Sequence, residues 1–188
     1  MFAYQTKGGV RMRYLRRLIW HIASRLFAFL LVLGILSITF YFAMNATNIY
    51  IIVKDGMARR AQVIMMDTSL TELDKYFSAS WIARDEMIRN AQNNVDPYRD
   101  CKITGFDHRI SLSTVWCWPW EDTARATMRE SIPRIDGKVK SSMRDTVTQL
   151  GLTASPPRWQ SAEYSVLLSR ENGRWIIKNM TVTEVINE

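Results

Sequence analysis

Residues 163–180 read EYSVLLSRENGRWIIKNM, and this stretch decides the architecture of the C-terminal half of the chain. Apolar and polar side chains alternate on both sides of Asn172–Gly173, a dipeptide preferred in the type I′ turn of a two-residue hairpin. If Glu171 pairs with Arg174, one face of the hairpin carries Tyr164, Val166, Leu168, Trp175 and Ile177. Arg170 then lies across from Trp175, within reach of a cation–π contact. The stretch therefore predicts an antiparallel hairpin with one buried face, and the following run TVTEVI is expected to continue its second strand.

Two upstream segments show the same alternation. In ITGFDHRISLSTVWCW, the face predicted to be buried carries Phe106, His108, Ile110, Leu112, Trp116 and Trp118. In DTARATMRESI, it carries Ala124, Ala126, Met128 and Ile132, with Glu130 among them. A one-residue slip would mix the two faces, so antiparallel pairing requires an odd-length connection. We predict the three-residue loop Pro119–Glu121, which places Trp116 opposite Ala124, Leu112 opposite Met128, Ile110 opposite Glu130 and His108 opposite Ile132.

The segment before these strands has helical periodicity. Leu70, Leu73, Phe77 and Trp81 recur at steps of three and four, which predicts one apolar face of a helix. A second turn or helix is expected through Met87 and Ile88. Between the predicted strand pairs, Asp136–Gly137 is a turn signal, and the residues up to Pro156–Pro157 are expected to form a polar loop or short helix.

An apolar run near the N-terminus predicts a membrane span. Residues 26–43 read LFAFLLVLGILSITFYFA, and no charged residue follows before Lys54. About 20 uncharged helical residues cross the hydrocarbon core, so we predict a transmembrane helix at 26–48. A cleaved signal peptide is the competing interpretation. The run is long for one, and AMNA at 43–46 is a weak cleavage site, so an uncleaved anchor is favoured.

The net charge of +7 comes from the residues before this span. Six basic residues and no acidic residue precede the apolar run, and without those six, 19 basic residues face 18 acidic ones. The near-neutral remainder argues against nucleic acid as a partner. The basic tail, residues 1–25, should stay in the cytoplasm, so the chain beyond the span should lie outside. We expect residues 49–67 to form a stalk or first helix without a clean apolar stripe, with Gly56 as a weak point, and residues 68–188 to form the extracytoplasmic domain.

The predicted order is one or more helices, a long bent strand, a hairpin, a crossover segment and a closing hairpin. It resembles the nuclear-transport-factor-2-like fold, in which a cone of curved antiparallel sheet wraps around helices. The closing YSVLLSRENGRWIIKNM, with its Gly–x–Trp–x–Ile pattern, is similar to that family's last strand pair. The resemblance implies an α+β outer domain on a single-pass bacterial membrane protein. Enzymes, ligand binders and assembly modules all use this fold, so the resemblance alone does not choose among them.

Possible cavity liners are His108, Glu130 and Tyr164. Asp107 and His108 are adjacent on a strand and point to opposite faces, so they should not form a dyad. Glu130 is either a buried base with a raised pKa or a residue at an exposed strand end, and the second interpretation is favoured. Cys101 and Cys117 would lie about 50 Å apart on a continuous strand, so we expect them to be unpaired. We predict no catalytic residue, no metal site and no cofactor.

The stretch VWCWPWED, residues 115–122, is the strongest candidate for partner binding. Trp120 falls at the predicted loop tip beside Pro119 and Glu121, and exposed tryptophans commonly anchor interfaces. Alternatively, Trp120 folds over the hairpin edge or shields the sheet from the membrane. The uncleaved anchor, the near-neutral outer domain and the absence of a catalytic constellation lead us to expect a non-enzymatic, membrane-anchored envelope protein. The resemblance in fold implies a complex of the secretion, conjugation or sporulation type. Its partners would be the lipid bilayer, through residues 26–48, and other envelope proteins or a second copy of the chain. The alternative is a ligand-binding or catalytic cone with a polar cavity.

Overall fold

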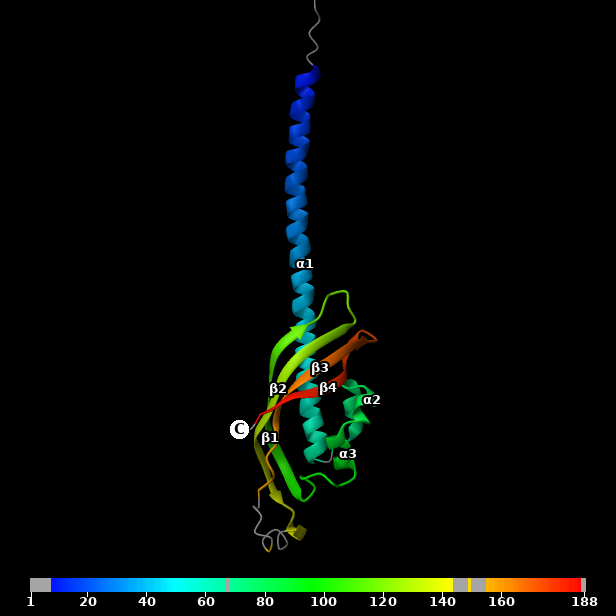
Figure 1. The fold of residues 1–188 in the computed structure, drawn as a ribbon, viewed down its shortest axis with the longest axis vertical. Coiled ribbons are helices and arrows are strands. Elements are labelled where there is room, and N and C mark those ends of the chain that lie inside the picture. The colour runs from blue at the N-terminus through cyan, green and yellow to red at the C-terminus, as the bar shows by residue number, and fades with distance from the viewer. Residues whose placement is uncertain (1–7, 67, 144–148, 150–154, 187–188) are drawn as a thin grey trace, which may run out of the picture. The chain divides into compact units, whose positions relative to one another are not determined.

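The computed structural model describes residues 8–66, 68–143, 149 and 155–186. It divides into two compact units, Met1–Ala43 and Met44–Glu188, the second of which is called the outer unit below. In chain order the elements are α1 (Gly8–Met66), η1 (Leu70–Lys75), α2 (Ala79–Ile82), α3 (Glu86–Gln92), β1 (Cys101–Trp116), β2 (Thr123–Val139), η2 (Ser141–Met143), β3 (Ser161–Glu171) and β4 (Arg174–Ile186), as Figure 1 shows. The predicted α+β class with a long N-terminal helix is confirmed.

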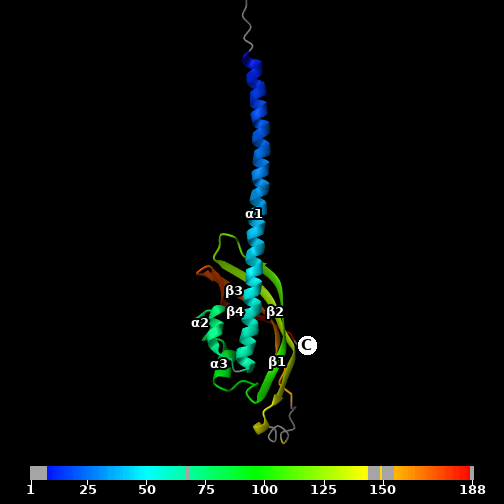
Figure 2. The ribbon, with the colours of Figure 1, turned by 180° about the vertical axis from the view of Figure 1, so that it is seen from behind.

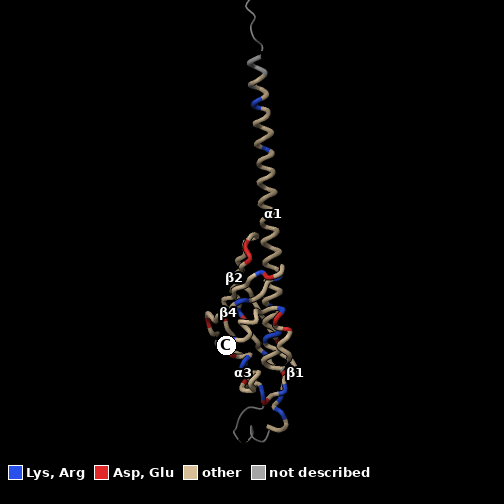
Figure 3. Tube along the Cα trace, turned by 90° about the vertical axis from the view of Figure 1, so that its right-hand side faces the viewer, with Lys and Arg blue, Asp and Glu red and all other residues tan. Residues whose placement is uncertain are grey.

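The described part of the first unit is helical throughout. Every side chain from Leu26 to Tyr41 is exposed, although most of them are apolar. Figure 3 shows a long stretch of α1 without charge, whereas both signs are interspersed over the outer unit. This helix is long and apolar enough to cross a membrane, which is compatible with the predicted anchor.

The outer unit contains one antiparallel sheet with the strand order β1-β2-β3-β4. Figures 1 and 2 show the strands curving around the C-terminal part of α1, with α2 and α3 on the same side of the sheet. The sheet is open, and its edges are β1 and β4. One face of the sheet and the helices enclose the core.

The closing hairpin forms as predicted. Asn172 and Gly173 have positive φ angles of 50° and 78°, as a type I′ turn requires. Glu171 pairs with Arg174, and the Arg170 guanidinium lies 4.7 Å from the centroid of the Trp175 ring. The five residues predicted to share the inner face are all buried. Strand β4 continues to Ile186, so the predicted extension is also confirmed.

Register between β1 and β2 follows the prediction only in the middle of the pair. Ile110 pairs with Glu130 and Leu112 with Met128, as expected. A register shift between Leu112 and Thr114 then reverses which side chains face inward. As a result Trp116 pairs with Arg125 rather than with Ala124, and the connection runs from Cys117 to Asp122. The predicted three-residue loop was therefore wrong.

The same shift overturns the prediction that Trp116 and Trp118 lie in the core. Trp116 is 58% exposed and Trp118 is 36% exposed, whereas Cys117 between them is buried. A second shift lies between Asp107 and Arg109, where His108 has no direct partner, so its predicted pairing with Ile132 was also wrong. Bulges of this kind depend on how the strand bends over the core, and alternation in the sequence does not reveal them.

The second part of α1 supplies a continuous buried stripe, contrary to expectation. Ile49, Val53, Met57, Ala61 and Ile64 are buried at helical spacing. The sequence hid this stripe because it also includes Gly56 and Arg60, which are not apolar. A Cβ at Gly56 would lie 2.9 Å from Tyr76 Cβ, so glycine permits close packing here and is not a weak point.

The predicted helix through Leu70 and Trp81 is broken in two. Ser78 N donates to Ile177 O at 2.9 Å, and Ile177 N donates to Tyr76 O at 2.8 Å. This short parallel bridge to β4 ends η1 before α2 begins. Phe77 and Trp81 nevertheless remain buried, with their rings stacked 4.5 Å apart. The expected second helix is α3.

Asp136–Gly137 does not form a turn but continues β2, with Gly137 opposite Ile103. A Cβ at Gly137 would lie 2.8 Å from Lys102 O, so the glycine serves close strand packing. Most of the expected polar loop or short helix that follows falls on residues 144–148 and 150–154, outside the described residues.

Candidate functional site

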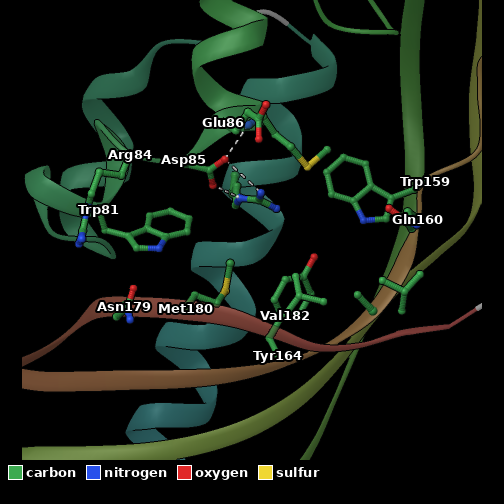
Figure 4. Close-up of a pocket in the computed structure, with 14 residues that line it drawn as sticks. Trp81, Arg84, Asp85, Glu86, Trp159, Gln160, Tyr164, Asn179, Met180 and Val182 are labelled. Carbon is green, nitrogen blue, oxygen red and sulfur yellow. Dashed lines mark hydrogen bonds and ion pairs between the residues drawn. The ribbon is translucent and has the colours of Figure 1, made fainter.

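A pocket of about 400 Å³ opens between the helices and the C-terminal hairpin of the outer unit. Figure 4 shows side chains around it that come from the helices and from the segments of β3 and β4. The residues that carry its chemistry are Arg60 of α1, Trp81 of α2, Asp85 before α3, Trp159 before β3, Tyr164 of β3 and Met180 of β4. Its volume falls within the range of sites for small molecules.

The pocket is organised by a buried ion pair. Arg60 Nε donates to Asp85 Oδ2 at 2.6 Å, and Arg60 Nη2 donates to Asp85 Oδ1 at 3.3 Å. Asp85 also caps α3, because its Oδ1 accepts from the backbone N–H groups of Met87 at 2.9 Å and Ile88 at 3.2 Å. Burial disfavours the charge of Arg60, but the adjacent Asp85 carboxylate outweighs it, and the pKa of Arg60 is raised. The guanidinium is therefore a fixed, permanent cation.

Two buried donors at this pocket have no hydrogen-bond partner among the described residues. They are Arg60 Nη1 and the indole Nε1 of Trp159. Both side chains are almost fully buried, with exposed fractions of 5% and 6%. In Figure 4 the hydroxyl of Tyr164 points toward the same region from the sheet. A buried N–H group without an acceptor costs free energy, so these two donors mark the pocket as a place where an acceptor would be stabilised.

A second polar pair, His108 and Glu130, lies outside the lining of the pocket. His108 Nε2 and Glu130 Oε1 are 2.9 Å apart, and Glu130 is fully buried. The expectation of an exposed strand end for Glu130 was wrong, because the inner face of β2 remains covered as far as Ile132. As expected, Asp107 does not pair with His108; it accepts from Arg109.

Only one of the three predicted cavity liners contacts the pocket. Tyr164 lines it, whereas neither His108 nor Glu130 is among its lining residues. Burial raises the pKa of Tyr164 to about 12, and the negative charge of Glu130 adds to the effect. The Tyr164 hydroxyl is therefore neutral at physiological pH.

The other candidate site is an exposed row of tryptophans at the β1–β2 connection, which we call the tryptophan ladder: Trp116, Trp118 and Trp120. Trp116 and Trp118 make an edge contact at 5.3 Å between ring centroids, and Trp118 stacks on Trp120 at 5.0 Å with 17° between the planes. Trp120 is 68% exposed, as a loop-tip position predicts. Sequence reasoning found Trp120 and its neighbours Pro119 and Glu121, but it missed the other two rings.

Backbone and side-chain bonds fix the base of this loop. Arg170 N donates to Asp122 O at 2.7 Å, and Arg170 Nη2 donates to Asn45 Oδ1 at 2.9 Å. Arg170 of β3 therefore connects Asp122 of the loop to Asn45 of α1, two residues after the apolar run ends at Ala43.

The cysteines take no part in either feature. Cys101 and Cys117 are free thiols near opposite ends of β1, and burial raises the pKa of both. Among the described residues, no three His, Cys, Asp or Glu side chains gather as metal ligands would.

The pocket and the ladder thus offer two kinds of binding: convergent donors for a small acceptor, and stacked aromatic rings for a larger surface. Arg60, Asp85 and Trp159 were missed as site residues because they belong to no motif. The one available signal was an arginine within an otherwise apolar helical stripe. No protein-family model, no curated protein and no solved structure matches the chain.

Proposed function

We propose that this chain is a single-pass membrane protein whose outer unit assembles with another envelope protein through the tryptophan ladder. The anchor is the apolar run of residues 26–43, shorter than the predicted span 26–48 because Asn45 is buried in the outer unit. The N-terminus is cytoplasmic, and the outer unit lies outside the membrane. The role is non-enzymatic, in a complex of the secretion, conjugation or sporulation type. The observation that carries this proposal is the exposure of three contacting tryptophan rings on a tethered loop.

Exposed tryptophans in contact with one another are unusual on a free surface. Aromatic residues are enriched at the centres of protein interfaces, where they dominate binding energy. Trp118 and Trp120 already hold their rings in a stack, so little side-chain entropy is lost on binding. Glu121 and Asp122 beside them supply the polar rim that such interfaces have.

A protein occupant is favoured over lipid for a chemical reason. The bond between Arg170 and Asn45 holds the loop near the point where the chain leaves the predicted membrane, and tryptophans also line membrane interfaces. However, the tip carries two adjacent carboxylates, which anionic headgroups repel. We therefore infer that the partner is itself membrane-bound and that it contacts the tryptophan ladder just outside the bilayer. This partner is consistent with both the position of the loop and the carboxylates at its tip.

Photocrosslinking in intact cells tests this proposal. A benzophenone amino acid at position 120 should give a protein adduct, to a different protein or to a second copy of the chain. The matched control is position 95, because Val95 is 67% exposed and Trp120 is 68% exposed. Adducts to lipid alone, or equal protein adducts from both positions, would contradict the proposal.

We also propose that the outer unit has a nuclear-transport-factor-2-like fold. Helices that precede a curved antiparallel sheet, with a hairpin that closes it, support that relationship. A small-ligand role is the second candidate, and the partnerless donors of the pocket favour it.

A further inference from the structure

Two observations at the pocket point to a hydrogen-bond acceptor supplied from outside the described residues. Arg60 and Trp159 both line the pocket, and Arg60 Nη1 and Trp159 Nε1 are buried without a hydrogen-bond partner among the described residues. The Arg60 guanidinium lies 6.0 Å from the Trp159 ring centroid, so the two donors belong to neighbouring groups. An acceptor between them would satisfy two costly N–H groups at once.

The walls of the pocket suit a flat apolar body. Trp81 and Trp159 stand on either side in Figure 4, and the Arg60 guanidinium lies 5.8 Å from the Trp81 ring centroid. Met87 and Met180 add flexible thioethers, which adapt to ligands of different outline. Apolar and aromatic side chains make up the larger part of the lining, beside four charged residues and the amides of Gln160 and Asn179.

Charge decides what kind of acceptor fits. Arg60 is already paired with Asp85, and Glu130 lies close enough for its charge to act on the guanidinium. The remaining charged lining residues, Arg84 and Glu86, are exposed and opposite in sign. A ligand carboxylate would add a third negative charge around one buried cation, which is unfavourable at low dielectric. A cationic ligand would meet donors that offer it nothing.

We propose that this pocket binds a small uncharged molecule with a flat apolar body and a carbonyl-type acceptor, held by Arg60 Nη1 and Trp159 Nε1. This assignment is independent of the tryptophan ladder, and each can fail without the other. The Tyr164 hydroxyl lines the same pocket but also interacts with Glu130, so it is not required as a donor to the ligand. Binding requires no covalent step.

Nuclear magnetic resonance of the full chain in lipid nanodiscs tests the proposal with three probes of one size: benzamide, benzoate and benzylammonium. The reporters are the indole N–H signal of Trp159 and the methyl signal of Met180. Benzamide should shift both signals in a saturable way and move the Trp159 N–H downfield. Its Kd should be at least roughly fivefold lower than that of either charged probe.

A Trp159→Phe variant removes one donor and keeps the aromatic wall, and the Met180 signal remains as reporter. It should weaken benzamide binding roughly 3- to 10-fold, the value of one neutral hydrogen bond. The matched control is Trp175→Phe, because Trp175 is equally buried but does not line the pocket; benzamide binding should not change.

Three results would overturn the proposal: no saturable shift with benzamide, binding of benzoate or benzylammonium at least as tight, or unchanged binding in Trp159→Phe. The comparison of the three probes needs no variant. The proposal can therefore be refuted by the three probes alone, even if Trp159→Phe fails to fold.

Discussion

Arg60 Nε lies 2.6 Å from Asp85 Oδ2, and this contact joins the C-terminal part of α1 to the N-cap of α3. Both side chains are buried, so neither charge can turn to water when the other is removed. The contact positions the wall of the pocket, and removal of either partner would leave the other charge buried and unpaired.

Asp85→Asn should destabilise the outer unit by about 3 kcal/mol, because it leaves the buried Arg60 charge unpaired. The amide oxygen can still cap α3, so the loss reports mainly on the ion pair. Urea titration of the full chain in detergent micelles, followed by circular dichroism, measures the change. Asp107→Asn is the control, because Asp107 pairs with Arg109 at the surface and its loss should not alter the midpoint measurably.

Gly56→Ala should destabilise the outer unit by about 1–3 kcal/mol, although alanine is the better helix former. The added Cβ would meet Tyr76 Cβ at 2.9 Å and Phe77 Cε2 at 3.3 Å. Thermal unfolding measures the change. Gly105→Ala is the control, because a Cβ there would have no atom of the described residues within 4 Å apart from its chain neighbours. An increase in stability for Gly56→Ala would show that the close approach to Tyr76 is not rigid.

His108 and Glu130 should be energetically coupled. A double-mutant cycle with His108→Ala and Glu130→Ala should give a coupling of about 1–3 kcal/mol, because their contact is buried. His108→Ala and Lys178→Ala form the control cycle. Those residues lie on β1 and β4, opposite edges of the sheet, and should be additive within about 0.5 kcal/mol. Additivity in the first cycle would mean that the contact contributes nothing to stability.

Alkaline pH should unfold the outer unit through its buried tyrosines. Burial raises the pKa of Tyr98 to about 12, with a further contribution from Asp96, and burial also raises that of Tyr164 to about 12. Below about pH 10 both states of the protein keep these protons. Between about pH 10 and pH 12 only the unfolded state releases them, so stability falls as pH rises, by at most about 2.5 kcal/mol for each tyrosine.

Urea midpoints measured from about pH 8 to pH 12, together with the absorbance of tyrosinate, test this expectation. Tyr98→Phe and Tyr164→Phe should each make the fall in stability shallower. Tyr50→Phe serves as control, because Tyr50 is exposed. An unchanged slope in both core variants would assign the alkaline transition to other groups.

Period and turn chemistry made the C-terminal hairpin predictable. The pair Asn172–Gly173 needs positive φ at both positions, and that requirement fixed the register from Leu168 to Ile177. Beyond it, a shift between Leu167 and Leu168 moves the pairing by one residue, which the turn does not predict. The apolar helix was predictable because an uninterrupted uncharged run of this length is typical of a membrane-spanning segment. In both cases the signal lies in adjacent residues.

Features that depend on distant residues were not predictable. The bulge after Leu112 reversed the sides of Trp116 and Trp118, and no local pattern marks it. The pocket joins Arg60 to Trp159, which lie far apart in the sequence. In the sequence, Gly56 and Arg60 interrupt the apolar stripe of α1. The stripe becomes evident only in the structure, where Tyr76 packs against Gly56 and Asp85 pairs with Arg60.

The buried stripe of α1 from Ile49 to Ile64 also means that this part of the helix is more than a connection to the apolar run. Its side chains belong to the core that the sheet and the shorter helices enclose. A protease cut within the stripe would detach the central helix from that core, so we expect the remaining fragment to unfold.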